Sequence, residues 1–416
     1  MFTVLSIVWN SFKMALQELR NNKLRTFLSL FGITIGIFCI IGVLATVESL
    51  EGKVQSDIKG LGSNTIYIDK WDYGGGADYP WWKFIKRPFP KYYEMELIKN
   101  RSSLAESVCF TISGNAPLEY KDVVLNGVSS HGVSEDFNSI LTVTIGYGRY
   151  MNVSEFSHGS PMAVIGNTNA ENLFGSAEKA IGKLVKYKDK QLQVVGVIKK
   201  QGTNIIGGGW EFDEAIIMPY KVMAGMFSDD DCNPKIMVKG KSNISSAGLL
   251  DELRGIMRSQ HRLSPRQPDD FALNDINTFS EQTSSLFGSI NMGGWFIAGL
   301  SLIVGAFGVA NIMFVTVRER TSQIGLKKAV GAKNATILTE FLLESAFLCL
   351  VGGLIGLILV YLLTIVLSAV MPFAITISMH TLTLAISICL IVGVLAGIIP
   401  ARIAAKMNPV VAIRTK

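Results

Sequence analysis

The feature that most constrains this chain is a set of long stretches without Asp, Glu, Lys or Arg. They cover residues 26–47, 282–317 and 345–401. A helix rises about 1.5 Å per residue and the hydrocarbon core of a bilayer is about 30 Å thick, so roughly 20 apolar residues cross it. The third stretch is long enough for two crossings with a turn near Pro372. The sequence therefore predicts four transmembrane helices, at residues 26–47, 283–317, 345–370 and 381–400.

The distribution of charge gives these helices an orientation. Lys and Arg outnumber Asp and Glu by three in residues 1–25, by two in 318–344 and by four in 401–416. Cytoplasmic segments carry such an excess. We therefore expect these three segments and both termini in the cytoplasm, and residues 48–282 on the outer side. The chain's net charge of +6 then reports topology and gives no support to nucleic-acid binding.

Residues 1–25 are expected to form an interfacial amphipathic helix in contact with membrane lipid. Their apolar side chains recur at helical spacing, and Trp9 is either an interfacial anchor or a packing residue. The apolar run that follows is longer than that of a signal peptide and ends without a small-residue cleavage pattern. It is therefore expected to remain as an anchor.

The outer region, residues 48–282, predicts an α+β domain, or two small ones, inserted between the first and second transmembrane helices. Short β-type runs occur at residues 65–68, 163–165, 194–198 and 215–218, with helical stretches near 170–174 and 248–259. Both flanking transmembrane helices are expected to continue outward as a stalk, because 36 uncharged residues before Arg318 exceed one membrane thickness. The alternative is a break in the second helix near Gly293 and Gly294.

The motifs of catalysis are missing from the sequence. No Gly-x4-Gly-Lys-Ser/Thr loop is present to cradle a phosphate, and the predicted transmembrane helices carry no Asp, Glu, Lys or Arg that could relay protons. The four histidines are scattered without metal-ligand spacing, so no metal site is predicted. We expect a non-catalytic membrane protein without a cofactor of its own. Cys109 and Cys232 either pair or remain free.

Two further patterns are candidates for contact surfaces. Three predicted transmembrane helices contain glycines four residues apart, a spacing that lets helices approach closely within the chain or across a dimer. These glycines are Gly32, Gly36, Gly352, Gly356, Gly393 and Gly397. Residues 69–93 contain nine aromatic residues. In that segment Trp71, Trp81 and Trp82 either contact a partner, lipid or substrate, or fold back on their own domain.

Several stretches in order along the chain resemble the permease part of MacB-type ABC transporters, which is shared with the FtsX and LolC/LolE proteins. The most characteristic is QIGLKKAVGA at residues 323–332. The others are residues 19–26, 60–66, 194–202, 341–344, 400–402 and 408–410. The resemblance covers nearly the whole chain but does not extend to residues 69–93. No nucleotide-binding domain like that of MacB is fused to it, so the chain is expected to be a stand-alone permease subunit.

The resemblance implies a multi-pass protein of the inner membrane with a periplasmic domain, a second permease copy and a separate ABC ATPase that binds ATP and Mg²⁺. In that family the loop between the second and third transmembrane helices contacts the ATPase. The residues that match are Ile324, Gly325, Lys327, Lys328, Gly331 and Ala332. ATPase movement would then be transmitted to the periplasmic domain for export or extraction of a substrate, with a possible periplasmic adaptor and outer-membrane channel. The alternative is an FtsX-like signalling scaffold that transports nothing.

Overall fold

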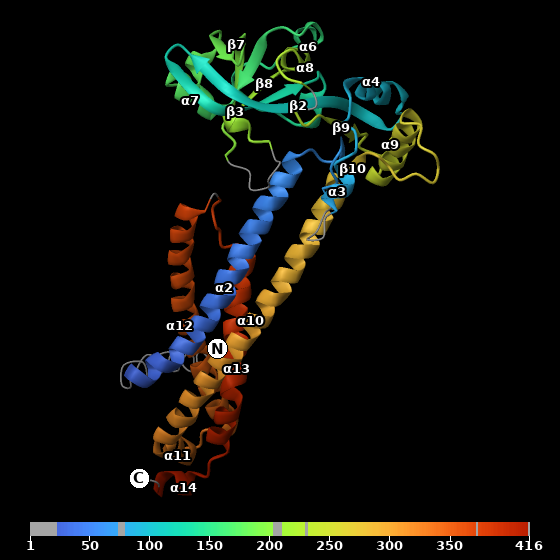
Figure 1. Cartoon of the computed structure of the whole chain (residues 1–416). Helices are drawn as coiled ribbons and strands as arrows, with labels where there is room; N and C mark the ends of the chain where they lie inside the picture. The colour runs from blue at the N-terminus through green and yellow to red at the C-terminus, as the bar shows by residue number, and fades with distance from the viewer. Residues whose placement is uncertain (1–22, 74–79, 203–209, 229–231, 372, 415–416) are drawn as a thin grey trace. The chain divides into compact units, whose positions relative to one another are not determined.

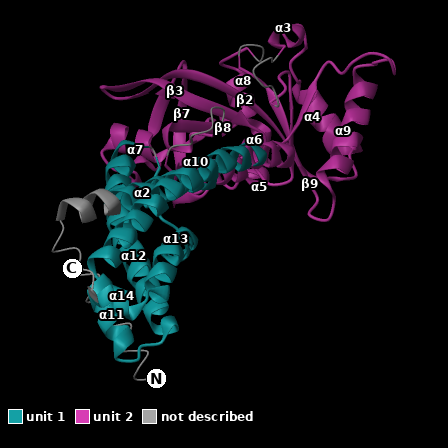
Figure 2. Cartoon of the chain, turned by 90° about the horizontal axis from the view of Figure 1, so that it is seen from below, with its two compact units in different colours: residues 1–52, 285–416 teal, residues 53–284 magenta. Residues whose placement is uncertain are grey.

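The computed structural model describes the chain except residues 1–22, 74–79, 203–209, 229–231, 372, 415 and 416 (Figure 1). Residues 1–22 of the predicted interfacial helix, which include Trp9, therefore lie outside the described residues. The chain forms two compact units (Figure 2). Unit 1 comprises residues 1–52 and 285–416, and unit 2 comprises residues 53–284.

Among the described residues, four helices are long and apolar enough to cross a membrane. They are α2 (Lys23–Gly60), α10 (Ile276–Glu319), α12 (Asn334–Val370) and α13 (Met379–Lys406). With the α/β domain between the first two, they confirm the predicted fold class. Helix α10 is continuous through Gly293 and Gly294, so the predicted alternative of a break there is wrong. Two short helices, α11 (Thr321–Ala329) and α14 (Pro409–Arg414), follow α10 and α13.

In its described residues, unit 2 is built on one sheet of ten strands. The strand order is β10-β1-β9-β2-β3-β8-β5-β7-β4, and β6 pairs with β2 and β7. The strands are β1 (Thr65–Asp69), β2 (Ala105–Tyr120), β3 (Val123–Val133), β4 (Ile145–Gly148), β5 (Met162–Ile165), β6 (Leu184–Tyr187), β7 (Lys190–Ile198), β8 (Ala215–Pro219), β9 (Lys235–Gly240) and β10 (Ala272–Asp275). The four predicted β-type runs are β1, β5, β7 and β8.

Short helices connect the strands of this sheet, and several of them pack against it. They are α3 (Trp81–Phe84), α4 (Tyr92–Arg101), α5 (Phe137–Ile140), α6 (Val153–His158), α7 (Asn167–Phe174), α8 (Tyr220–Ala224) and α9 (Ser246–Gln260), with 3₁₀ turns η1 (Glu178–Ala180) and η2 (Phe212–Glu214). The two predicted helical stretches correspond to α7 and α9. Helix α9 is capped by Ser245, whose side chain accepts a hydrogen bond from the amide of Gly248, as N-capping serines do.

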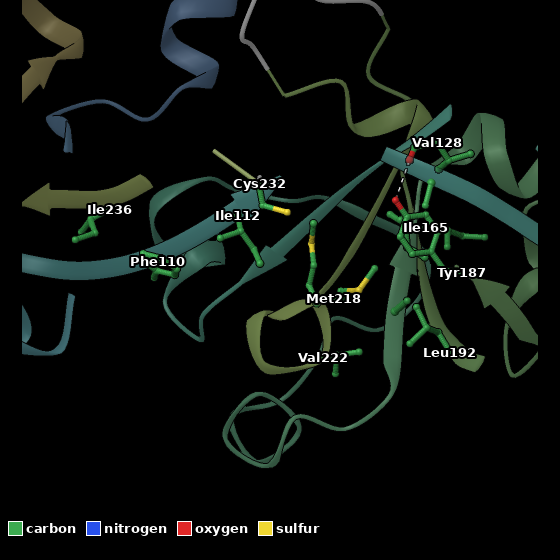
Figure 3. Packing of buried hydrophobic residues seen from close by; sticks show 14 of the residues in the cluster. Phe110, Ile112, Val128, Ile165, Tyr187, Leu192, Met218, Val222, Cys232 and Ile236 are labelled. Atoms are coloured by element: carbon green, nitrogen blue, oxygen red, sulfur yellow. Dashed lines mark hydrogen bonds between the residues drawn. The ribbon is translucent and has the colours of Figure 1, made fainter. Parts of the chain in front are cut away.

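The sheet has a core on each face because successive strand residues point to opposite sides. On β2, Phe110 and Ile112 belong to one buried cluster, shown in Figure 3, while Cys109 belongs to the other. In the first cluster the hydroxyl of Tyr187 donates to the carbonyl oxygen of Val128 at 3.0 Å, which satisfies a buried polar group.

The two faces of the sheet also separate Cys109 from Cys232, the two cysteines that could have formed a disulfide. Cys232 packs in the cluster of Phe110, on the opposite face of the sheet from Cys109. Both thiols are buried and neither is in a disulfide bond. The alternative in which Cys109 and Cys232 pair is therefore wrong, because the sheet itself separates the two side chains.

Candidate functional site

The candidate site is the segment between α10 and α12, built around the short helix α11. Helix α11 stops because Gly331 has a φ of +101°, a conformation that glycine adopts without strain. There the amide of Gly331 donates to the carbonyl oxygen of Lys328, and the amide of Ala332 donates to that of Lys327, both at 3.0 Å. These two bonds satisfy carbonyls at the helix end. Gly331 and Ala332 thus terminate α11 and turn the chain toward α12.

One face of α11 is buried. Ile324 is 3% exposed and packs in the apolar core of unit 1. Gly325 lies against α14: a Cβ atom placed on it would come within 2.8 Å of the Ala412 Cβ and 3.2 Å of the Ile413 amide nitrogen. The absence of a side chain at Gly325 therefore allows α11 and α14 to pack in direct contact.

Two ion pairs join the α11 region to α12. Arg320, at the N-terminus of α11, lies 3.1 Å from Glu344, whose side chain is 1% exposed. Lys327 lies 2.5 Å from Glu340, and its own side chain is 48% exposed. The Arg320 pair is buried, and removing one partner of such a pair leaves a charge in the protein interior, whereas the exposed Lys327 pair contributes little.

Lys328 joins α11 to α13. Its ammonium donates to the carbonyl oxygens of Ala405 and Met407, each at 2.7 Å, at the C-terminal end of α13. The last carbonyls of a helix lack partners within the helix and carry partial negative charge, so a lysine there is favourable. Both predicted coupling lysines are thus engaged within the chain.

The outward side of α11 and α14 carries exposed apolar side chains that the sequence reasoning missed. Leu326 is 62% exposed and Val330 is 84% exposed. The neighbouring α14 adds Val410, Val411 and Ile413, which are 63%, 64% and 48% exposed. We call these five residues the α11–α14 patch. The available signal was the presence of Leu326 and Val330 within a basic segment predicted to face water.

The glycines predicted for helix packing lie where helices of unit 1 meet. A Cβ on Gly36 would come within 3.2 Å of the Ser301 carbonyl oxygen in α10, and one on Gly356 within 2.9 Å of the Thr34 carbonyl oxygen in α2. Gly32 faces Gly305 at 3.7 Å, and the Gly352 carbonyl accepts a bond from the Thr34 hydroxyl at 3.2 Å.

Helices α12 and α13 meet in the same way. A Cβ on Gly393 would lie 2.8 Å from the Cα of Ala346, and one on Gly397 would lie 2.9 Å from the Cβ of Ser345. These close approaches are between helices of one chain. Across the described residues, no group of three or more His, Cys, Asp or Glu side chains is arranged to hold a metal ion.

The aromatic segment is divided by the structure. Trp71 is half-buried and its carbonyl oxygen accepts a bond from the side-chain amide of Asn274 at 2.8 Å. Trp81 and Trp82 form a T-shaped pair on α3 and are both exposed. The structure therefore places Trp71 within its own unit and leaves the other two at the surface.

Two family models match the chain. The MacB-like periplasmic core domain matches residues 26–256, and the FtsX-like permease C-terminal model matches residues 295–409. The second model includes α11 and part of α14. It also includes all six predicted coupling residues between Ile324 and Ala332.

Curated relatives extend over nearly the whole chain. The macrolide export ATP-binding/permease protein MacB of Chlorobaculum tepidum is 29% identical over 405 residues, and that of Neisseria gonorrhoeae is 28% identical over 407. Each alignment covers 96% of this chain but 60% of the relative. Among solved structures, the periplasmic region of MacB from Actinobacillus actinomycetemcomitans aligns with a TM-score of 0.44 at 17% identity, covering 55% of this chain and 95% of that one.

Proposed function

Because this chain belongs to the MacB-like family with an FtsX-like permease part, we propose that it couples a cytoplasmic ABC ATPase to movement of unit 2 for export or extraction of a substrate. ATP and Mg²⁺ would be bound by the ATPase, and this chain would act without catalytic chemistry of its own. A second permease copy, a periplasmic adaptor and an outer-membrane channel belong to the same proposal. So do the inner-membrane location with cytoplasmic termini and the predicted domain boundaries.

The observation that carries the proposal is the α11–α14 patch. Its five apolar side chains lie on the segment whose flanking charges predict a cytoplasmic location. Exposed apolar clusters of this kind mark interaction sites, and buried apolar anchors contribute most of the energy of protein interfaces. We therefore assign the ATPase contact to Leu326 and Val330 with their neighbours on α14.

The predicted coupling residues then acquire positioning roles. Lys328 holds α11 to the end of α13. Arg320, which was not among the predicted residues, holds the α11 region to α12, and the exposed pair of Lys327 with Glu340 adds little to this. Because α11 is attached to three other helices, a force on it is distributed to all of them. The continuous helix α10 of 44 residues, roughly 66 Å long, supplies a stiff connection from residues of unit 1 to residues of unit 2.

The test replaces both Leu326 and Val330 with Asp in the full chain, purified from its native membrane with its partners. We expect the amount of ABC ATPase that copurifies to fall at least tenfold, since a hot-spot residue contributes about 2 kcal/mol or more. Ser322→Asp is the matched control, because Ser322 is an exposed polar residue on the same helix. It should leave copurification unchanged.

Three results would overturn the proposal. The double variant could retain the ATPase at the level of the unaltered chain. A preparation of this chain free of any ATPase could hydrolyse ATP. A topology reporter placed within residues 100–250 could locate that region in the cytoplasm.

A further inference from the structure

The surface of unit 2 carries an aromatic and basic segment that the proposed function does not use. Trp81, Trp82 and Ile85 are 55%, 58% and 50% exposed. Helix α3, to which both tryptophans belong, contains no buried residue. Burial in the core of unit 2 therefore does not account for these large apolar side chains. We call residues 80–89 the α3 segment.

The base of this segment is fixed to the rest of the unit. Arg87 donates from its guanidinium to the carbonyl oxygen of Lys70 at 3.3 Å and stacks over the ring of Phe84 at 4.1 Å. The ammonium of Lys70 lies 4.5 Å from the ring centre of Phe89. Pro90, directly after the segment, is buried. The two tryptophans are therefore held outward by a defined anchor.

Positive charge surrounds the tryptophans. Residues 80–91 contain four Lys and Arg and no Asp or Glu, and Lys83 and Lys86 are exposed. By contrast, residues 48–282 carry a net charge of −3, which is the whole-chain +6 less the +9 of the three basic segments. The α3 segment is thus locally cationic on a domain whose net charge is slightly negative, and this charge favours an anionic ligand.

This combination of residues suits the interface of a bilayer. Tryptophan is enriched at headgroup depth, where its ring is partly apolar and its N–H remains hydrated. Lysine and arginine beside it are attracted to anionic lipids. An exposed tryptophan pair also suits a protein interface. A protein interface, however, gives no reason for the neighbouring charges to be all positive, whereas an anionic lipid surface does. The observations therefore favour lipid over a protein partner.

Because unit 2 is covalently attached to helices that can cross a membrane, even a weak affinity for lipid can give appreciable binding. Both ends of the unit continue into α2 and α10, which are apolar enough to cross a membrane. A segment tethered in this way meets lipid at a high effective concentration, so that modest affinity gives appreciable occupancy.

We propose that the α3 segment is a peripheral membrane anchor that inserts Trp81 and Trp82 shallowly into the headgroup region of an anionic leaflet, with Lys83 and Lys86 at the lipid phosphates. The anchor goes beyond the proposed function and does not rest on it. Unit 2 would contact the bilayer through it whether or not an ATPase is bound.

The experiment measures quenching of tryptophan fluorescence by brominated lipid in the full chain reconstituted into nanodiscs. The discs contain phosphatidylcholine alone or its mixture with phosphatidylglycerol, with bromine near the headgroup end of the acyl chains. We expect more quenching in the anionic discs. Replacing both Trp81 and Trp82 with Phe should reduce this difference to what the remaining four tryptophans, Trp9 and Trp295 among them, contribute.

Charge variants test the electrostatic part separately. Lys83→Gln with Lys86→Gln keeps both tryptophans and should reduce occupancy about fivefold per lysine. Lys179→Gln with Lys183→Gln removes two other exposed lysines of unit 2 and should change nothing. Thermal unfolding of each variant checks that the fold is retained.

The anchor is overturned if quenching is equal in neutral and anionic discs, or if the Trp81/Trp82 variant is quenched in anionic discs as strongly as the unaltered chain. It is also overturned if both tryptophans remain fully accessible to the aqueous quencher acrylamide in anionic discs. That last result would assign the exposed pair to a protein partner.

Discussion

The backbone of Gly325 lies against Ala412, so closely that a methyl group on Gly325 would come within 2.8 Å of the Ala412 side chain. The two residues are far apart in sequence and belong to the short helices α11 and α14. This contact sets how closely α11 and α14, the two helices that carry the α11–α14 patch, can approach each other.

Gly325→Ala is therefore expected to separate α11 from α14. Overpacking of this kind costs about 1–3 kcal/mol. In an ordinary helix position the same substitution stabilises by about 0.5–1 kcal/mol. Copurification of the ATPase and its Mg-ATP hydrolysis measure the effect, and both should fall while the chain still inserts. Gly255→Ala in α9 is the control, because a Cβ there meets nothing within 4 Å. Equal behaviour of the two variants would contradict the prediction.

Gly356→Ala tests the contact of α12 with α2. The new Cβ would lie 2.9 Å from the Thr34 carbonyl oxygen, a backbone atom that cannot rotate away. We expect the thermal unfolding temperature of the full chain in detergent to decrease. Gly299→Ala in α10 meets nothing within 4 Å and should leave that temperature unchanged or raise it slightly. A decrease for both variants would mean that glycine flexibility, and not close packing, matters here.

Because of His261, the stability of unit 2 is expected to decrease at alkaline pH. Its Nε2 lies 2.9 Å from Glu94 and its Nδ1 lies 2.6 Å from Asp270. The hydrogen bond to Glu94, with that to Asp270, raises the pKa of His261 from 6.5 to about 9. A histidine whose pKa is raised in the folded state contributes stability that is fully present below pH 6.5 and is lost as pH rises through about 9.

His261→Gln should remove this dependence. Between pH 6 and pH 10 we expect the unaltered chain to lose about 1–2 kcal/mol relative to the variant, after allowance for solvent screening. Chemical unfolding followed at several pH values measures the difference. Parallel pH profiles for the two proteins would show that His261 titrates without coupling to the fold.

The cysteines of unit 2 are expected to resist modification in the folded protein. Cys109 and Cys232 are buried and not in a disulfide bond, and burial raises the pKa of Cys109 to about 12. A maleimide reagent of high mass should therefore label neither residue before denaturation. It should label both after denaturation without reductant. Failure to label both in that second step would reveal a disulfide.

The transmembrane helices could be predicted because their signal is local. A stretch such as residues 26–47 shows its nature in composition alone, and β1, with Ile66 and Ile68, is short, apolar and β-branched. The hairpin of β2 and β3 escaped prediction, since Ser113, Gly114 and Asn115 interrupt its apolar pattern. Pairing across the hairpin stabilises that stretch, and pairing is not visible in the sequence of one strand.

The chemistry of the loop was harder to predict for the same reason. Lys328 carries a charge that suits an ATPase contact, yet it donates to carbonyls 77 and 79 residues away. The carboxylate of Glu344 accepts a hydrogen bond from the guanidinium of Arg320, at the other end of the loop. Partners so far apart in sequence are brought together only by tertiary packing. The sequence therefore identified the loop between α10 and α12 as the candidate site. It did not show which residues of that loop hold the helices together and which are exposed for contact.

The position of α14 has a practical consequence for anyone who manipulates this chain. Only Met407 and Asn408 separate it from α13, yet its side chains complete a surface shared with the loop between the second and third transmembrane helices. An epitope tag fused close behind Arg414, or a premature stop codon after Lys406, would therefore disturb that loop some 80 residues upstream. A phenotype obtained with such an allele should not be attributed to the terminal residues alone.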